Sequence, residues 1–338
     1  MYKRNCYSDL MTKIKWGILS TAKIAETALI PAINKSKNSE LIAVASRNKD
    51  KANKFAKLHS IPNNYGSYKK LYNDPNIDVI YNPLPNHLHL KSTIEAAKAG
   101  KHVLLEKPIT LRSKDVDKLI DISKKNKILI SEAFMVRHHP QWIWIKQQIK
   151  KGFLGKVRSI NSVFSYNNKD PKNIRNIKKY GGGAIYDIGC YPIQISRFIL
   201  GKEPLQVMAI SKFDKIFKTD FLSSAILDFG DIHSLFTVST QSAMKQSVTI
   251  LGDRKAIVVE NPFNPKPSKT TTIIVYNNKS IYRNKNLIKL FSPSDQYENQ
   301  VNDFSKKIIK KNKFIHNLED AKKNMMVIDS IFLSNKLE

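Results

Sequence analysis

The sequence is poor in cysteine, in long apolar runs and in acidic residues, and the first two shortages exclude whole classes of protein. Two cysteines in 338 residues are too few for a disulfide framework, which fits a reducing cytoplasmic location. No window approaches the roughly eighteen uncharged apolar residues of a membrane span, so no membrane partner is expected. Residues 1–12 form a leader without the apolar core of a signal peptide, and Met11 could be the true start. The length suffices for two domains with proper cores.

The shortage of acidic residues leaves a strongly basic chain. Lysine and arginine number 57 against 28 aspartates and glutamates, a net charge of +29. A basic face attracts phosphate backbones, so nucleic-acid binding has to be considered. The lysines are scattered in small groups such as Lys124-Lys125 and Lys310-Lys311, and no recognisable nucleic-acid module accompanies them. We interpret the charge as a compositional bias on solvated faces and expect no nucleic-acid partner.

The first half alternates short apolar runs with helical stretches. Alternation of strands and helices is typical of a parallel sheet with helices on both faces, and crossovers of this length are what parallel pairing requires. The pattern predicts a doubly wound nucleotide-binding sheet. Its strands are expected at 14–19, 41–45, 79–81, 103–105 and 128–130, with helices near 24–34, 49–59, 88–99 and 113–125.

The first strand-to-helix turn resembles a dinucleotide fingerprint without its glycines. Ser20, Ala22 and Ala25 stand where the three glycines would be. Small residues satisfy the need for close approach to a pyrophosphate, although they lack glycine's freedom at positive φ. By itself the pattern also fits an ordinary turn. The pyrophosphate contacts predicted here are Ser20, Thr21, Ala22, Lys23 and Ile24.

The end of the second strand favours NADP over NAD. NAD enzymes place an acidic residue there for the ribose 2′-hydroxyl, whereas this chain has Ser46 and Arg47, followed by Lys51. A hydroxyl and a guanidinium suit a 2′-phosphate. A solvated arginine is the alternative in so basic a chain, and NAD is then the alternative cofactor.

The loop after the strand at 79–81 contains two prolines and should line the ligand cleft. Ligands bind at the carboxyl ends of parallel strands. We therefore expect cofactor contacts from Pro83, Leu84, Asn86 and His87, while His89 is expected to face the helix exterior. Neither histidine has metal-ligand neighbours in the sequence, so no metal site is predicted.

A lysine and a tyrosine form the candidate proton-transfer pair. Lys107 ends an apolar run within Glu106-Lys107-Pro108, a place that solvation alone explains poorly. Tyr191 follows Asp187 by four positions, so the two share a face if the segment is helical. An ammonium near a phenol lowers the phenol's pKa and makes it a better base. Considered alone, Tyr191 fits an ordinary core residue better than a catalytic one.

The combined motifs resemble the Gfo/Idh/MocA family of NAD(P)-dependent oxidoreductases, in particular the branch with glucose–fructose oxidoreductase, xylose dehydrogenase and dimeric dihydrodiol dehydrogenase. The resemblance rests on the turn at 16–25, the loop at 82–87, Glu106-Lys107-Pro108 and the segments 134–140, 170–176 and 181–191. It implies a Rossmann domain at 13–133 and an α/β domain at 134–338 with an open, mainly antiparallel sheet, through which a homodimer or homotetramer would form. Strands fitting that sheet are expected at 157–165, 206–213, 223–227, 235–239, 248–251, 256–259 and 271–275, with helices near 297–310 and 321–333 that would pack on the sheet or return to the first domain.

The resemblance also implies roles for individual residues. Lys107 matches the family's catalytic lysine, followed by a proline in a cis bond, and Asp187 matches the aspartate of the cleft. Tyr191 stands where some members have histidine, and it is the family resemblance that reverses the preference for an ordinary core role. We therefore expect NADP-dependent hydride transfer to or from a sugar or related cyclic alcohol, with Tyr191 and Lys107 moving the proton. The alternatives are a trans-dihydrodiol dehydrogenase, a keto-sugar reductase or a non-catalytic NADP-binding sensor. Further expected contacts are Glu106 to the cofactor and Arg137, Phe164, Arg175, Asp187 and Tyr191 to the substrate.

Overall fold

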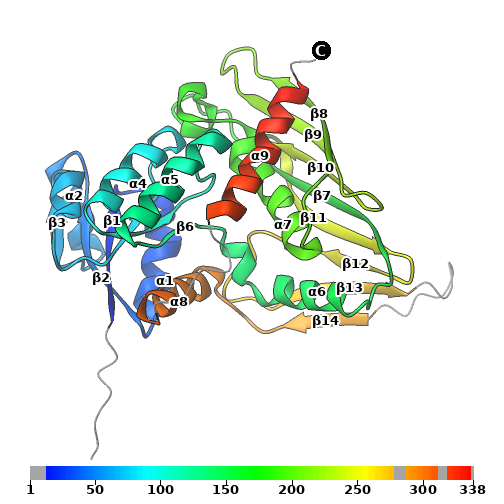
Figure 1. Cartoon of the computed structure of the whole chain (residues 1–338), viewed down its shortest axis with the longest axis horizontal. Coiled ribbons are helices and arrows are strands. Elements are labelled where there is room, and N and C mark those ends of the chain that lie inside the picture. The colour runs from blue at the N-terminus through cyan, green and yellow to red at the C-terminus, as the bar shows by residue number, and fades with distance from the viewer. Residues whose placement is uncertain (1–12, 278–286, 311–317, 336–338) are drawn as a thin grey trace, which may run out of the picture.

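The computed structural model describes residues 13–277, 287–310 and 318–335, so the predicted leader lies outside the described residues. Its strands form two sheets, one in each half of the chain (Figure 1). The α/β class expected from the sequence is confirmed. No helix of the described residues is both long enough and apolar enough to cross a membrane.

The first sheet has six parallel strands in the order β3-β2-β1-β4-β5-β6. Its central strands are buried on both faces, which explains their nearly continuous apolar sequences. The strands are β1 (Ile14–Leu19), β2 (Ser39–Ala45), β3 (Asn63–Tyr65), β4 (Val79–Asn82), β5 (His102–Leu105) and β6 (Ile130–Glu132). The helices between them are α1 (Ile30–Lys35), α2 (Lys49–Leu58), α3 (Tyr68–Tyr72), α4 (His89–Lys98) and α5 (Ser113–Asn126).

The predicted alternation of strands and helices is confirmed, with two differences. β3 and α3 were not predicted from the sequence, because both are short and β3 has no buried residue. The strand predicted at 128–130 begins at Ile130, since Ile128 still belongs to the turn after α5, where its N–H donates to Ser123 O.

The second sheet has eight strands in the order β14-β13-β12-β11-β7-β10-β9-β8. All neighbouring pairs are antiparallel except β7 and β10, so the sheet is mixed and mainly antiparallel, as expected. Its strands are β7 (Val157–Asn167), β8 (Gln206–Phe213), β9 (Asp220–Asp228), β10 (His233–Ser239), β11 (Gln241–Gly252), β12 (Lys255–Val259), β13 (Thr271–Asn277) and β14 (Leu287–Phe291).

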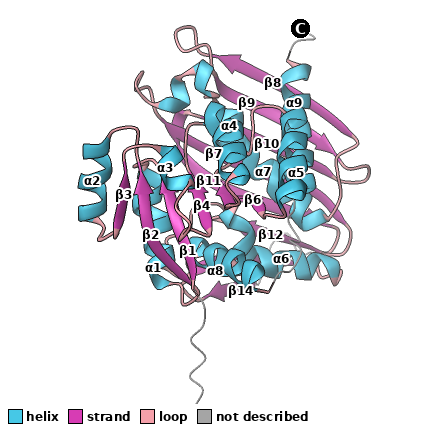
Figure 2. Ribbon diagram, turned by 60° about the vertical axis from the view of Figure 1, so that its left-hand side comes forward, coloured by secondary structure: helices cyan, strands magenta, loops and turns pink. Residues whose placement is uncertain are grey.

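Among the described residues, helices cover one face of the second sheet and leave the other open (Figures 1 and 2). Figures 1 and 2 show α6 (Pro140–Lys150), α7 (Cys190–Leu200) and α9 (Leu318–Ser334) on that side. On the opposite face Met208 and Ile210 of β8 are exposed. Alternation of half-buried and exposed positions along β8 fits a sheet with one open face.

Both C-terminal helices contact the first domain, and α9 also packs on the second sheet. α8 (Gln296–Ile309) returns to the first domain, where the ring of Phe304 lies 5.6 Å from that of Trp16 and Val301 joins the same core. α9 packs against α5 of the first domain and also against β8 of the second sheet. α8 and α9 therefore connect the two domains by packing.

Two helices, α1 and α7, are each preceded by a wide helical turn, and each has a proline near its start. Pro31 follows the π-helical turn Ala25–Leu29, and Pro192 follows the π-helical turn Ile185–Gly189. A proline inside a helix lacks an N–H and crowds the carbonyl four residues earlier, and a wider turn relieves both problems. Tyr191 therefore lies in the first turn of α7, one turn beyond Asp187.

Candidate functional site

A cavity of about 450 Å³ lies where the carboxyl ends of β4 and β5 meet β7 and β11. This is the edge of the first sheet at which parallel α/β folds bind their ligands. Segments more than one hundred residues apart in the sequence contribute to its walls. The cleft is lined by Ile24, Pro83, Leu84, Asn86, His89, Glu106, Lys107, Phe164, Ser165, Tyr166, Asn168, Ile174, Arg175, Tyr180, Gly181, Gly182, Asp187, Ile188, Tyr191, Met244, Gln246, Asn264 and Tyr297.

Lys107 points from the end of β5 to Asp187 on the opposite wall. Its Nζ donates to the backbone carbonyl of Asp187 and lies 3.3 Å from Asp187 Oδ1. The peptide bond between Lys107 and Pro108 is cis, as the family resemblance implied. Burial opposes the charge on Lys107, but Asp187 together with the nearby Cys190 and Glu106 outweighs burial and raises the lysine's pKa. The lysine is therefore a fixed cation within the cleft.

Asp187 is the centre of the polar network. Its Oδ2 accepts a hydrogen bond from the Tyr166 hydroxyl at 2.5 Å and lies 2.9 Å from Arg175 Nε. Burial alone would favour the neutral acid, yet Lys107 and Arg175 hold the pKa of Asp187 well below its usual range. Both carboxylate oxygens are thereby engaged, and the aspartate fixes the position of the lysine.

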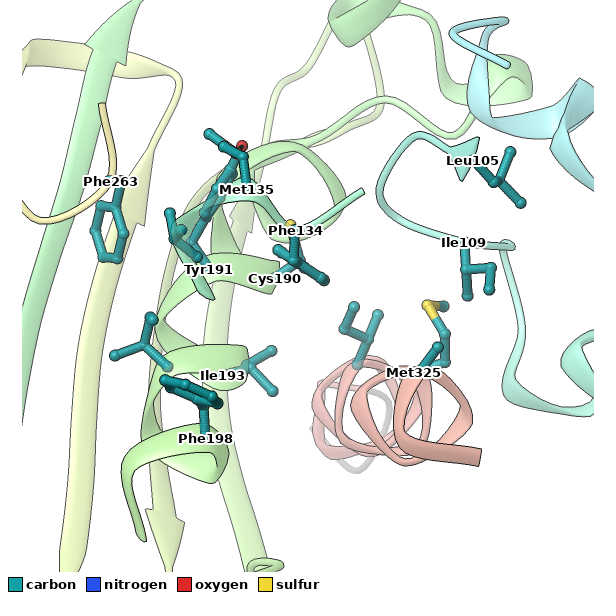
Figure 3. Close-up of a cluster of buried hydrophobic side chains, with 14 of the residues drawn as sticks. Leu105, Ile109, Phe134, Met135, Cys190, Tyr191, Ile193, Phe198, Phe263 and Met325 are labelled. Carbon is teal, nitrogen blue, oxygen red and sulfur yellow. Dashed lines mark hydrogen bonds between the residues drawn. The ribbon is translucent and has the colours of Figure 1, made fainter. Parts of the chain in front are cut away.

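Tyr191 borders the cleft with its ring set in an apolar cluster (Figure 3). The hydroxyl's hydrogen-bond partner is Met135 Sδ at 3.7 Å, and Lys107 Nζ lies 5.0 Å from the ring centre. Burial raises the pKa of Tyr191 well above that of a free phenol, and nearby acidic groups add to the effect. The expected net lowering of this pKa is not found in this structure, because desolvation of the buried phenol dominates. The phenol is protonated and can donate a proton. Rings lie within 6 Å of it from Phe134, Phe164 and Phe263.

Tyr166 is a site residue that the sequence analysis missed. It lies two positions after Phe164 on β7, and both side chains line the cleft. Residues i and i+2 of a strand point to the same face. Because Phe164 was expected in the pocket, this alternation is the signal that could have identified Tyr166.

Two side chains, the buried His89 and the partly buried Glu132, hold the loop that carries Lys107. His89 is fully buried, with Nδ1 2.8 Å from Pro108 O and Nε2 2.7 Å from Leu84 O. The expectation that it faces the helix exterior is therefore wrong. Glu132 Oε1 accepts the N–H of Ile109 at 2.8 Å. These contacts link the loops after β4, β5 and β6 around the lysine.

Glu132 should make stability depend on pH. Burial raises its pKa from 4.5 to about 8, so the folded protein binds this proton more tightly than the unfolded chain does. The free energy of unfolding should then fall as pH rises from about 4.5 through 8. Glu132→Gln keeps an acceptor for the Ile109 N–H and removes the titration. Between pH 5.5 and 8.5, Tm should decline less in this variant than in the wild type, and parallel Tm curves would contradict the assignment.

Some of the other predicted site residues line the cleft and others do not. Pro83, Leu84, Asn86 and Glu106 line the cleft, and Phe164 and Arg175 do so from the opposite side. His87 does not: its ring stacks on Tyr180, with centroids 4.4 Å apart and planes 7° apart.

Arg137 was expected to contact the substrate, and the structure places it elsewhere. It is buried outside the cleft, paired with Asp320 and packed 5.6 Å from the ring of Phe198. The segment that suggested it turns inward after β6, which the sequence motif alone did not reveal.

The turn after β1 fits a dinucleotide pyrophosphate. Ser20 has a φ of 68°, the left-handed conformation that a glycine would adopt there. Its N–H donates to Ala45 O at 2.7 Å. Within the described chain, no acceptor takes the N–H groups of Thr21, Ala22, Lys23 and Ile24, as is usual at a helix N-terminus, which is a ready anion site.

The residues expected at a 2′-phosphate lie at the carboxyl end of β2. Ser46 Oγ is 3.3 Å from the N–H of Asn48, Arg47 is exposed, and Lys51 is exposed on the first turn of α2. Burial raises the pKa of Tyr68 and neighbouring Arg47 opposes that rise, so the guanidinium lies near this phenol. A hydroxyl and an exposed guanidinium at this edge fit NADP. Within the described ranges, no group of three or more His, Cys, Asp or Glu side chains could hold a metal ion.

This chain is similar to known proteins over most of its length. A model of an oxidoreductase family with an NAD-binding Rossmann fold matches residues 14–134, and a model of the GFO/IDH/MocA C-terminal domain matches residues 142–258. An uncharacterized oxidoreductase, ORF334, of Rhizobium meliloti is 40% identical over 322 residues, 95% of this chain and 96% of that protein. A D-xylose 1-dehydrogenase (NADP(+)) of Haloferax volcanii is 29% identical, over 94% and 96% of the two chains.

A solved structure shows the same fold. A 3-ketoreductase from Actinomadura kijaniata, in complex with NADP and TDP-benzene, superposes with a TM-score of 0.90 at 24% identity, covering 96% of this chain and 98% of that one. With the matched relatives and the two family models, this chain belongs to the Gfo/Idh/MocA family of NAD(P)-dependent oxidoreductases.

Proposed function

We propose that this chain transfers a hydride between the nicotinamide of NADP and a sugar, or a related cyclic alcohol, with Lys107 and Tyr191 as the proton-transfer pair. The observation that carries the proposal is the meeting of Lys107, Asp187 and Tyr191 at the carboxyl ends of the first sheet's strands. Bound NADP would supply the hydride acceptor or donor. A xylose dehydrogenase among the relatives supports a sugar substrate.

The residues have distinct tasks in this proposal. Lys107, fixed by Asp187, donates a hydrogen bond to the substrate oxygen and stabilises negative charge that develops on it. Tyr191 exchanges a proton with that same oxygen, giving it up when a carbonyl is reduced and taking it when an alcohol is oxidised. Asp187 keeps the ammonium in place and compensates its charge.

A keto-sugar reductase is the second candidate, and the state of Tyr191 favours it. The raised pKa keeps the phenol protonated, which is the form needed to protonate a carbonyl oxygen. The two candidates share one site and differ in the direction of hydride transfer. We also propose a cytoplasmic enzyme that forms a homodimer or homotetramer through the open face of the second sheet, where Met208 and Ile210 are exposed.

Absorbance at 340 nm separates these candidates. Purified protein is mixed with NADP⁺ or NAD⁺ and with xylose, glucose, arabinose or a trans-dihydrodiol, and NADPH is mixed with keto-sugars. We expect reduced cofactor to form with an aldose or to be consumed with a keto-sugar. Turnover with the dihydrodiol alone would overturn the sugar proposal, and turnover with NAD⁺ alone would overturn the NADP assignment.

Arg47 offers a separate test of cofactor choice. Arg47→Ala removes the guanidinium proposed for the 2′-phosphate, so KM for NADP⁺ should rise by about tenfold or more while KM for NAD⁺ changes little. Lys54→Ala, which removes an exposed cation on the same helix α2, is the matched control and should leave both constants unchanged. An equal rise for both cofactors in Arg47→Ala would contradict the assignment.

A further inference from the structure

One wall of the cleft presents an arginine whose terminal nitrogens are free. Arg175 Nε pairs with Asp187 at 2.9 Å, and 44% of the arginine side chain is exposed. Within the described residues, its two terminal nitrogens have no hydrogen-bond partner. Because Nε is tied to Asp187, the remaining N–H groups of the guanidinium are available to a ligand in the cavity that Arg175 lines.

Two amide side chains that line the same cavity also have N–H groups without an acceptor among the described residues. Asn168 Oδ1 accepts the N–H of Asp170 at 3.1 Å, and Gln246 Oε1 accepts the N–H of Asn264 at 3.2 Å. In the part of the chain that the structure describes, neither amide NH₂ group has an acceptor. Both residues line the cavity with Arg175. Their oxygens are occupied and their N–H groups are free, so they too present donors.

The protein supplies no free carboxylate to match these donors. The acidic residues that line the cavity are Glu106 and Asp187. Glu106 Oε1 accepts the Tyr81 hydroxyl at 2.6 Å, and Asp187 is held by Lys107, Tyr166 and Arg175. The wall formed by Asn168, Arg175 and Gln246 therefore suits a ligand rich in acceptor oxygens.

We propose that the substrate carries an anionic group, a carboxylate or a phosphate, which binds the free N–H groups of Arg175 with Asn168 and Gln246 alongside. Arginine presents planar, paired donors that match two oxygens of either group. Arg175 already has Asp187 as a charged partner at Nε, but a neutral sugar would leave its terminal N–H groups without an anionic acceptor. Sugar acids or sugar phosphates are thus preferred over neutral sugars, an inference that rests on the proposed sugar oxidoreductase function.

Isothermal titration calorimetry tests this preference without turnover. Glucose, glucuronate and glucose 6-phosphate are titrated into protein with and without saturating NADP⁺, at constant ionic strength. At least one anion should bind about tenfold or more tightly than glucose. Tighter binding of glucuronate or of glucose 6-phosphate identifies the anion as a carboxylate or a phosphate.

Variants test whether the anion preference comes from Arg175, Asn168 and Gln246. Arg175→Gln should reduce the ratio of anion affinity to glucose affinity to about one, whereas Arg158→Gln, at an exposed position of β7 outside the cleft, should retain the anion preference. Asn168→Ala and Gln246→Ala, which leave Arg175 and Asp187 in place, should each weaken anion binding several-fold.

The inference is overturned if all three ligands bind alike or not at all, or if Arg175→Gln keeps the preference. A failure of NADP⁺ to bind would instead count against the proposed function. The titrations without cofactor then still decide the anion preference.

Discussion

Lys107→Met is expected to lower kcat by about two to four orders of magnitude, the usual cost of losing a group that takes part in proton transfer. Methionine has a similar length and no charge, so it removes the cation from the substrate oxygen without opening a large cavity. Asp187 would keep Tyr166 and Arg175 as partners. The variant should therefore fold normally and bind NADPH.

The measurement is steady-state turnover at 340 nm, with Tm and NADPH affinity measured in parallel. Lys91→Met, which replaces an exposed lysine on α4, is the matched control and should turn over like the wild type. Turnover of Lys107→Met within a few-fold of the wild-type value would contradict the role assigned to the lysine.

Tyr191→Phe is the second variant with a large expected effect, a loss of about a hundredfold or more in kcat. The substitution keeps the ring that packs against Phe134, Phe164 and Phe263, so only the proton donor is lost. KM for the substrate should change much less than kcat, because the missing hydroxyl acts mainly in the transition state.

Tyr166→Phe is the control for this variant. Tyr166 donates to Asp187 Oδ2, and its loss would leave Arg175 on the same oxygen, so the decrease in kcat should be smaller. A larger loss in Tyr166→Phe than in Tyr191→Phe would instead identify Tyr166 as the proton donor.

The architecture was largely predictable because its elements are long and strongly patterned. β1 and β2 are nearly continuous apolar runs, and β7 to β13 were all located from their sequences. β3 carries no buried side chain and β14 buries only Phe291, so apolar pattern gave little signal for either.

The candidate site was predictable where chain order determines position. Lys107 follows directly on β5, so its placement at the carboxyl edge of a parallel sheet follows from the fold class. Arg137 and His89 were placed wrongly from the sequence, because the direction of a side chain in a short turn depends on tertiary packing. The protonation of Tyr191 depends on burial among residues from distant segments, such as Phe263, and no local pattern contains that information.

Transfer of deuterium from substrate to cofactor tests the central claim most directly. The sugar that the 340 nm panel selects is prepared with deuterium on the carbon to be oxidised, and the reduced cofactor is analysed by mass spectrometry. For a substrate that reacts only in the reducing direction, NADPH deuterated at C4 is used and the product is analysed. We predict one deuterium in the acceptor, with formation strongly reduced in Lys107→Met and Tyr191→Phe. Product formed without transfer of the label, or transfer undiminished in both variants, would contradict the account.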